Sequence, residues 1–181
     1  ICNEFLNSLS EIQIKSGKGE LLKYAFLDKE IGELILMEGL SSKAILKCGK
    51  FKELIVDLDF KEEGKRKILN FGHTLGHAVE KSLDIPHGIA VYCGIEMILK
   101  LYGKNLLDKF YELSSQMELD FKFEKIDYDI FINFLKRDKK SLSSGEIDII
   151  TPSKFGEAKI ERINTEQLII DVKEGLSEYF K

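Results

Sequence analysis

Apolar residues recur every three or four positions along most of the chain, which is the spacing of amphipathic helices. Only Pro86 and Pro152 interrupt this pattern. It predicts a mainly α fold, and Ser41 or Ser42 and Asp127 are suited to cap two of the helices. The expected helices cover about residues 3–9, 20–28, 42–58, 66–83, 87–102, 106–117 and 128–137; the second follows a break at 16–19 and is open to continuation through 31–35.

Near the C-terminus the spacing of the apolar residues changes from every three or four positions to every second position. Residues 146–150 and 158–163 alternate, and residues 151–156 between them are typical of a turn. This predicts one short β-hairpin near residues 146–163, followed by a last helix that Asn164 and Gln167 would open as a capping box. A glycine-rich phosphate loop between a strand and a helix is missing, so the sequence predicts no Rossmann-type nucleotide unit.

Composition narrows the class of protein. The 181 residues are 44% hydrophobic, enough for the core of a single domain over residues 1–181. The net charge of −4 argues against general binding to nucleic acid or to anionic lipid. The apolar runs are short, and the first residues do not resemble a signal peptide, so we expect a cytoplasmic protein with no membrane span.

The three cysteines are too few and too scattered for a disulfide framework or a thiolate metal cluster. The chain also begins with Ile1 in the middle of a pattern, from which we expect a piece of a longer protein.

All three histidines fall between Arg66 and Gly88. If residues 66–83 form one helix, then Arg66, Asn70, His73 and His77 share one face among apolar neighbours. Buried polar groups need partners, so a metal, an anion or a polar network should face this polar stripe. Gly72 and Gly76 cost a helix about 1 kcal/mol each, which close approach of a neighbouring backbone would offset.

Histidines four residues apart on a helix can both bind one metal, or one can bind while the other transfers protons. Spacing alone leaves these alternatives open. His87 follows the break at Pro86, and Glu20, with Lys23 one turn on, is a plausible carboxylate partner, although an exposed ion pair explains Glu20 and Lys23 equally well. The segment His73–His77 lacks the glutamate of zinc proteases, which argues against that class.

The chain resembles the C-terminal domain of the 3-dehydroquinate synthase family of sugar-phosphate cyclases. The most specific block is residues 64–80, GKRKILNFGHTLGHAVE, and further blocks are SGKGELLKY at 16–24, HGIAV at 87–91 and DKK at 138–140. One departure is Ile89, where the family commonly has glutamate. The resemblance spans nearly the whole chain and implies a multi-helix domain of the dehydroquinate synthase-like fold.

The resemblance also implies roles for residues that spacing could not assign. Glu20, His73 and His87 would bind a metal, usually Zn²⁺ with Co²⁺ as the alternative, and His77 would transfer protons or bind substrate. Asp59 and Glu62 match acidic family positions that would orient the anion-binding residues. The phosphate and carboxylate of the substrate would be held by a set of basic and amide side chains, some of them also catalytic: Lys23, Lys52, Arg66, Asn70 and one of Lys139 or Lys140. On sequence alone, Lys52, Lys139 and Lys140 look solvent-exposed.

The activity implied is cyclisation of 3-deoxy-arabino-heptulosonate 7-phosphate to 3-dehydroquinate with loss of phosphate, in the shikimate pathway of aromatic amino acid biosynthesis. NAD would oxidise a hydroxyl transiently, and the metal would act on vicinal hydroxyls as a Lewis acid. Family members carry NAD on an N-terminal Rossmann-like domain, which is absent from this chain, so we expect the isolated chain to be inactive. The expected partners are that domain, a sugar-phosphate substrate and a second copy in a homodimer.

Three other functions remain open from the sequence. Metal-dependent polyol or alcohol dehydrogenases also place histidines on such helices, and other sugar-phosphate cyclases share the histidine block. The third is a non-catalytic helical metal-binding or assembly module.

Overall fold

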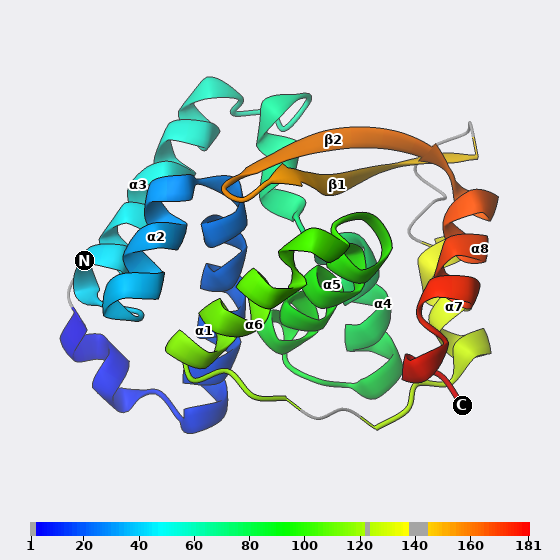
Figure 1. Ribbon diagram of the computed structural model, residues 1–181, viewed down its shortest axis with the longest axis horizontal. Coiled ribbons are helices and arrows are strands. Elements are labelled where there is room, and N and C mark those ends of the chain that lie inside the picture. Colours follow the sequence, from blue (N-terminus) through cyan, green and yellow to red (C-terminus); the bar gives the residue numbers. More distant parts are fainter. Residues whose placement is uncertain (1–2, 122–123, 138–144) are drawn as a thin grey trace.

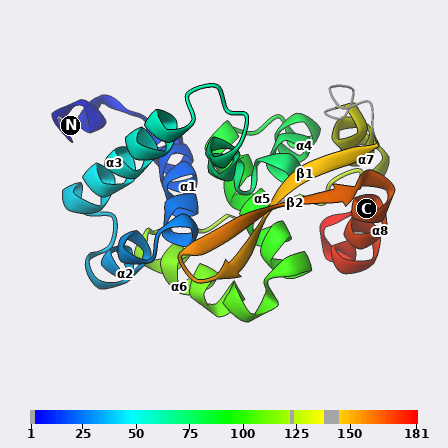
Figure 2. The ribbon, with the colours of Figure 1, turned by 90° about the horizontal axis from the view of Figure 1, so that it is seen from above.

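The computed structural model describes residues 3–121, 124–137 and 145–181. Helices α1 to α3 lie at one end, α7 and α8 lie at the other, and a two-stranded sheet crosses over α5 between them (Figures 1 and 2). The mainly α fold with one hairpin is therefore confirmed. The elements are η1 (Asn3–Ser8), α1 (Glu11–Leu27), α2 (Lys29–Glu38), α3 (Ser42–Leu58), η2 (Lys65–Asn70), α4 (His73–Leu83), α5 (His87–Tyr102), η3 (Lys104–Leu106), α6 (Leu107–Gln116), α7 (Tyr128–Arg137), β1 (Glu146–Lys154), β2 (Glu157–Asn164), α8 (Thr165–Gly175) and η5 (Ser177–Tyr179).

Side-chain caps set the ends of several helices. The hydroxyl of Ser41 accepts from the amide of Ala44 at 3.3 Å, and Asp127 accepts from the amide of Ile130 at 2.9 Å. Asn164 accepts from the amides of both Glu166 and Gln167, but the side chain of Gln167 donates to Asp171, so the predicted capping box is only half formed. The predicted starts of α3, α7 and α8 are confirmed, because each has a short polar residue that satisfies free amides of the first turn.

The predicted break at residues 16–19 was wrong. Helix α1 begins at Glu11, behind a capping box in which Ser10 and Gln13 satisfy each other's backbone amides, and it runs through these residues. Continuation of this helix to 35 was also wrong. Asp28 ends α1 with an extended backbone and caps α2 by accepting from the amide of Ile31 at 3.0 Å.

The single helix expected over residues 66–83 is broken in the middle. Residues 65–70 form the 3₁₀ helix η2, and α4 begins only at His73. Gly72 between them has φ +80°, a left-handed conformation that glycine adopts without the steric cost of a Cβ. The prediction that Arg66 and Asn70 share one helical face with the histidines was therefore wrong.

Helix α5 is the centre of the core. Eleven of its residues, from Gly88 to Leu99, are buried, so it is apolar on nearly every side. Helix α4 packs on one side of α5 and α1 packs on another. Side chains from α1 to α8 then join one hydrophobic cluster around it.

Glycines allow these three helices to approach backbone to backbone. A Cβ added to Gly94 of α5 would lie 2.6 Å from the amide nitrogen of Gly76 in α4. A Cβ on Gly76 would lie 2.9 Å from the carbonyl oxygen of Ala90, and one on Gly19 of α1 would collide with the carbonyl of Gly88. The predicted close approach is confirmed at Gly76 and also at Gly72, where an added Cβ would lie 2.9 Å from the amide nitrogen of Ile95. It explains the glycine inside α4 at position 76, whereas Gly72 precedes that helix.

The hairpin packs its apolar side chains against the helices and holds η2. Ile147 and Ile149 are buried, and β1 runs to Lys154, two residues beyond Pro152. The turn predicted over residues 151–156 was too long, because residues 151–154 belong to β1 and only residues 155–156 form the turn. A bulge between Pro152 and Lys154 accommodates the proline. Asp148 of β1 binds Lys67 of η2 at 2.8 Å and Arg162 of β2 at 2.9 Å.

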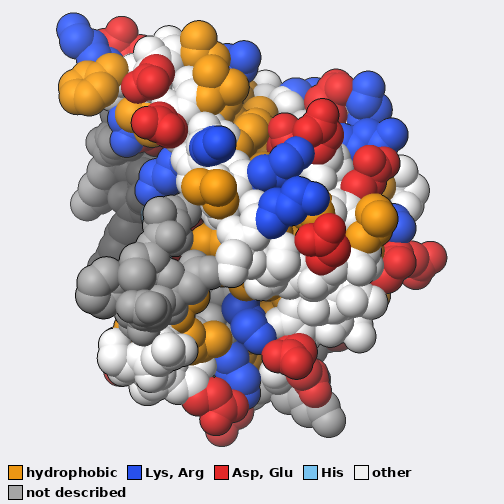
Figure 3. Space-filling model, turned by 90° about the vertical axis from the view of Figure 1, so that its left-hand side faces the viewer, with side chains coloured by type: hydrophobic (Ala, Val, Ile, Leu, Met, Phe, Trp, Pro, Cys, Tyr) orange, Lys and Arg blue, Asp and Glu red, His pale blue; other side chains and the backbone are white. Residues whose placement is uncertain are grey.

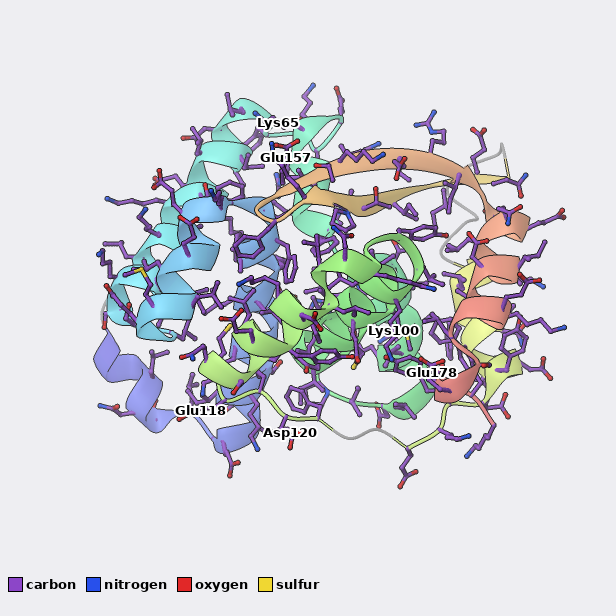
Figure 4. All side chains as sticks on the ribbon, in the orientation of Figure 1. Lys65, Lys100, Glu118, Asp120, Glu157 and Glu178 are labelled. Carbon is purple, nitrogen blue, oxygen red and sulfur yellow. The ribbon has the colours of Figure 1, made fainter. Side chains whose placement is uncertain are left out.

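The chain's C-terminal end is tied to the central helix. Lys100 near the end of α5 pairs with Glu178 of η5 at 3.0 Å, and both are labelled in Figure 4. Basic, acidic and apolar side chains are intermixed on the end that carries α2 and α3 (Figure 3). None of the helices in the described part of the chain combines the length and hydropathy needed to cross a membrane.

Replacing Gly94 tests the close packing of α4 on α5. Gly94→Ala should lower the free energy of unfolding by roughly 1–3 kcal/mol, because the helices must move apart to admit the methyl group. Thermal and urea unfolding would measure this loss. The matched control is Gly17→Ala in α1, where an added Cβ meets no heavy atom within 4 Å. In this variant the free energy of unfolding should rise by up to about 1 kcal/mol. Equal effects of the two substitutions would contradict the account.

Replacing Asp148 tests the link between η2 and the hairpin. Hydrogen bonds from Arg162, which has the larger effect, and from Lys67 hold the pKa of Asp148 below its usual value. Its contribution to stability should be complete above the unfolded-state pKa of about 4 and should disappear as the pH falls through the lower folded-state pKa. Asp148→Asn should therefore cost about 1 kcal/mol at pH 7, and unfolding curves of variant and wild type should converge near pH 2. An equal difference at both pH values would contradict this.

Candidate metal centre

Three potential metal ligands converge where α1, α4 and α5 meet. Glu20 lies on α1, and His73 and His87 are the first residues of α4 and α5. One oxygen of Glu20, Oε1, lies 3.5 Å from Nε2 of His73 and 3.3 Å from Nε2 of His87. The two imidazole rings are 5.2 Å apart between centroids. The structure thus brings together the residues that the resemblance implied as ligands, while their binding of a metal stays a prediction.

The other ring nitrogens of both histidines face hydrogen-bond acceptors. Nδ1 of His73 lies 3.2 Å from the carbonyl oxygen of Phe71, and Nδ1 of His87 lies 2.8 Å from Oε2 of Glu80. A neutral imidazole has one proton, and each acceptor calls for that proton on Nδ1. In the neutral form of each ring, Nε2 is therefore the nitrogen that carries the lone pair.

Glu20 is ionised, and only one of its two carboxylate oxygens accepts a hydrogen bond from a described residue. Oε2 accepts a hydrogen bond from Nζ of Lys23 at 2.8 Å, whereas Oε1 is buried and has no hydrogen-bond partner among the described residues. Burial raises the pKa of Glu20, but the charge and the hydrogen bond of Lys23 act against burial, and the pKa is lowered overall. The result is a buried anionic oxygen without a partner, which is costly unless a cation or a donor reaches it.

Burial also keeps His73 neutral. Desolvation, with a further contribution from the charge of Lys23, lowers its pKa to about 4. The pair of His73 and Glu20 is therefore not a salt bridge at neutral pH, and a nitrogen lone pair faces an anionic oxygen instead. A divalent cation between these atoms would remove this repulsion.

The dimensions fit such an ion. Oxygen and nitrogen ligands about 2.0–2.1 Å from a tetrahedral Zn²⁺ lie roughly 3.3 Å from one another. The distances from Glu20 Oε1 to the two Nε2 atoms are 3.3 and 3.5 Å, and all three ligand atoms lie within 4.8 Å of one another. Two histidines and one carboxylate with a position left open are typical of catalytic rather than structural zinc sites.

His77 borders the cluster from the solvent side. It is exposed, and its ring lies 5.5 Å from those of His73 and His87 between centroids. Together with Glu80 and His87 it forms a second group of potential ligands. These three side chains line an open pocket of about 510 Å³ beside the first group. His77 can therefore reach a molecule in the pocket without being needed as a ligand of the first group.

Arg66 and Asn70 lie on η2, and their side chains form hydrogen bonds with the preceding loop rather than with the histidines. Arg66 donates to the carbonyl of Phe60 at 2.7 Å, and Asn70 donates to Glu62 at 2.8 Å. Glu62 has φ +59°, a conformation that costs a non-glycine residue energy. Asp59 fixes the same loop, because it accepts from the backbone amides of residues 63, 64 and 66.

Of the four remaining predicted residues, the structure places Lys52 and Lys23. Lys52 is exposed on α3 and has no hydrogen bond or ion pair with any described residue. Lys139 and Lys140 lie outside the described residues. Lys23 is buried beside Glu20, so the alternative of an exposed ion pair for these two residues was wrong.

Sequence reasoning gave no role to two residues that shape the site. Glu80 lies seven positions after His73 and three after His77, a spacing that places it on their face of α4 and could have identified it. Ser16 accepts from the amide of Gly88 at 3.0 Å and so fixes the start of α5 against α1. No sequence pattern reveals that contact, since 72 positions separate the two residues.

Comparison with protein families gives a direct match to this region. Residues 17–141 match the model of the family described as 3-dehydroquinate synthase C-terminal. The chain belongs to this 3-dehydroquinate synthase C-terminal family. All three converging ligands and η2 lie inside the matched region.

Named members of the 3-dehydroquinate synthase family align along almost the whole chain. The chain is 35% identical to the 3-dehydroquinate synthase of Pyrococcus furiosus over 96% of its own length and 54% of the relative's. It is 33% identical to that of Clostridium tetani, over 98% of this chain and 52% of the relative. The chain thus spans about half the length of the curated relatives it matches.

Solved structures share the fold of this family member. The chain superposes on 2-epi-5-epi-valiolone synthase ValA from Streptomyces hygroscopicus subsp. jinggangensis, solved with NAD⁺ and Zn²⁺, with a TM-score of 0.77 and 19% identity. The match covers 97% of this chain and 54% of ValA. A 2-deoxy-scyllo-inosose synthase complexed with carbaglucose-6-phosphate, NAD⁺ and Co²⁺ gives a TM-score of 0.74 at 21% identity, over 96% and 54% of the two chains. The dehydroquinate synthase-like fold is therefore confirmed.

Metal analysis of variants would decide between the two possible ligand groups. The purified chain should bind about one Zn²⁺, and His73→Ala should lose it because one of three ligands is removed. His77→Ala is the matched control, four residues along the same helix, and should retain the metal. Elemental analysis after dialysis measures both. Loss of zinc in His77→Ala but not in His73→Ala would place the ion in the second group and contradict this assignment.

Proposed function

We propose that this chain is the metal- and substrate-binding half of a 3-dehydroquinate synthase. The observation that carries the proposal is the convergence of two imidazole nitrogens on a carboxylate oxygen that has no hydrogen-bond partner among the described residues. The family match and the alignment of almost the whole chain with about half of each enzyme of that name support the activity.

Glu20, His73 and His87 would hold Zn²⁺ or Co²⁺, the ions named in the two solved relatives of the same fold. A bound divalent ion would supply a Lewis acid for the hydroxyls and the ketone of the substrate. The chain's own residues would then bind the substrate, orient it and move protons.

His77 is the proposed proton carrier. It borders the open pocket and is not needed as a ligand of the first group, so its ring nitrogens are available to a bound molecule. Lys23 has a different task in the proposal. Its ammonium group keeps Glu20 ionised and gives the buried centre a positive charge on the side of α1.

The substrate of the proposed reaction, 3-deoxy-arabino-heptulosonate 7-phosphate, carries a carboxylate and a phosphate. Arg66 and Asn70 are donors suited to such groups, and their hydrogen bonds to Phe60 and Glu62 show how the loop aims them in this structure. Binding an anion would exchange these internal acceptors for substrate oxygens. Lys52, Lys139 and Lys140 remain proposed members of the same set.

The proposal divides the active centre between two halves. The chain covers about half of its relatives, and NAD⁺ is bound in both solved structures of this fold. We propose that the other half of such an enzyme supplies NAD and that cyclisation with loss of phosphate requires both. A homodimer is part of the same proposal.

A second candidate is another sugar-phosphate cyclase, which the valiolone and inosose synthase folds favour. The reaction product separates these cyclases. Accumulation of reduced NAD with an oxidised product would instead indicate a polyol dehydrogenase, and a chain that binds metal but no sugar phosphate would be a non-catalytic module.

Calorimetry with substrate tests the proposal on the chain itself. The zinc-loaded chain should bind 3-deoxy-arabino-heptulosonate 7-phosphate, and Arg66→Gln should weaken binding about tenfold or more, because one charge-assisted donor is lost. Lys50→Ala is the control, since Lys50 is an exposed lysine on α3 like Lys52 but has no assigned role.

A fusion tests the activity itself. Joined to the N-terminal half of the Pyrococcus furiosus relative, the chain should release phosphate and form 3-dehydroquinate with NAD, whereas the chain alone should not. Absence of both substrate binding and turnover would contradict the proposal, and phosphate release by the chain alone would contradict the division into halves.

A further inference from the structure

Glu80 joins the two helices that carry the histidine ligands. It lies on α4, and its Oε2 is 2.8 Å from Nδ1 of His87 at the start of α5. Only the short connection 84–86 separates the helices, with Asp84 in a left-handed conformation at φ +51°. The contact therefore links a side chain near the end of α4 to the ligand that opens the next helix.

This contact decides which nitrogen of His87 faces the site. An ionised carboxylate accepts hydrogen bonds and does not donate them, so the imidazole proton must be on Nδ1. In the neutral ring the lone pair is then on Nε2, the atom that lies 3.3 Å from Glu20 Oε1. The opposite tautomer would place a proton where a metal ion would bind.

His87 needs this restraint more than His73 does. The side chain of His73 is 13% exposed and is held by the surrounding core, whereas that of His87 is 43% exposed. The carbonyl of Phe71 orients His73 through the rigid backbone beside Gly72. For the exposed ring of His87, Glu80 provides the corresponding acceptor.

We propose that Glu80 is a positioning residue that fixes the ring and the tautomer of His87 for metal binding. This inference rests on the metal centre of the proposed function and extends it to a residue outside the ligand set. Partners of metal-bound histidines typically change metal affinity about 10- to 100-fold when they are removed. Glu80 should have an effect of this size although it does not touch the ion.

Two other roles for Glu80 make different predictions. Glu80 also lies 3.6 Å from Lys81, its exposed neighbour, and an ion pair at the surface would contribute to stability but not to metal binding. Alternatively, Glu80 could itself be a ligand in the group with His77 and His87. In that case His77 would be required for metal binding and Glu20 would not.

Zinc affinity measured by competition with a chelator separates these roles. Glu80→Ala should bind zinc about 10- to 100-fold more weakly than wild type. Glu80→Gln should lose less, because its amide oxygen still accepts from Nδ1 of His87. Lys81→Gln is the matched control and should bind zinc like wild type. In the metal-free protein, nitrogen NMR should show His87 protonated on Nδ1 in wild type and a mixture of tautomers in Glu80→Ala.

The outcomes also separate this inference from the proposed function. If wild type binds zinc through Glu20 and His73 but Glu80→Ala binds within about twofold of it, this inference fails and the metal centre stands. Equal weakening by Lys81→Gln would show a structural ion pair and overturn the inference. Zinc binding that needs Glu80 and His77 but survives Glu20→Gln would make Glu80 a ligand and overturn both.

Discussion

Backbone contact among three helices is the constraint on which the site depends. Gly19 of α1 meets Gly88 of α5, and Gly76 of α4 meets Gly94 of α5, at separations that leave no room for a Cβ. Two of the proposed metal ligands are neighbours of these glycines in the sequence: Glu20 follows Gly19, and His87 precedes Gly88. The close approach, rather than the helical spacing of the histidines, is what brings a carboxylate and two imidazoles from distant parts of the chain together.

The histidine cluster and the η2 segment differ in how the hydrogen bonds of their polar side chains are satisfied. Around the histidines, the Phe71 carbonyl, Glu80 and Lys23 bind one polar atom each of His73, His87 and Glu20. The remaining ligand atoms of these three residues lie within 4.8 Å of one another. On η2, by contrast, Arg66 and Asn70 are engaged with the loop that Asp59 and Glu62 stabilise. The first arrangement contains a buried carboxylate oxygen without a hydrogen-bond partner among the described residues, at which we propose that a cation binds. The second has its hydrogen bonds satisfied until an anion replaces the internal acceptors.

Local signals predicted most of the fold and a resemblance supplied the ligand set. Short polar caps such as Ser41 and Asn164 and the alternation of β1 and β2 act over a few residues, so the sequence shows them. The break at Gly72 was missed because it depends on packing against Val91 and Ile95 of α5. The start of α1 was missed although its signal is local, since Ser10 and Gln13 form a capping box. The role of Glu20 could not be derived from spacing, since 53 positions separate it from His73 in the sequence (73 minus 20).

Anomalous diffraction from crystals of the chain grown with Zn²⁺ tests the central claim most directly. The account predicts one strong peak about 2.0–2.1 Å from Nε2 of both His73 and His87 and about 2.0–2.2 Å from an oxygen of Glu20. A peak bound instead by His77 and Glu80, with Glu20 Oε1 still unpartnered, would contradict it.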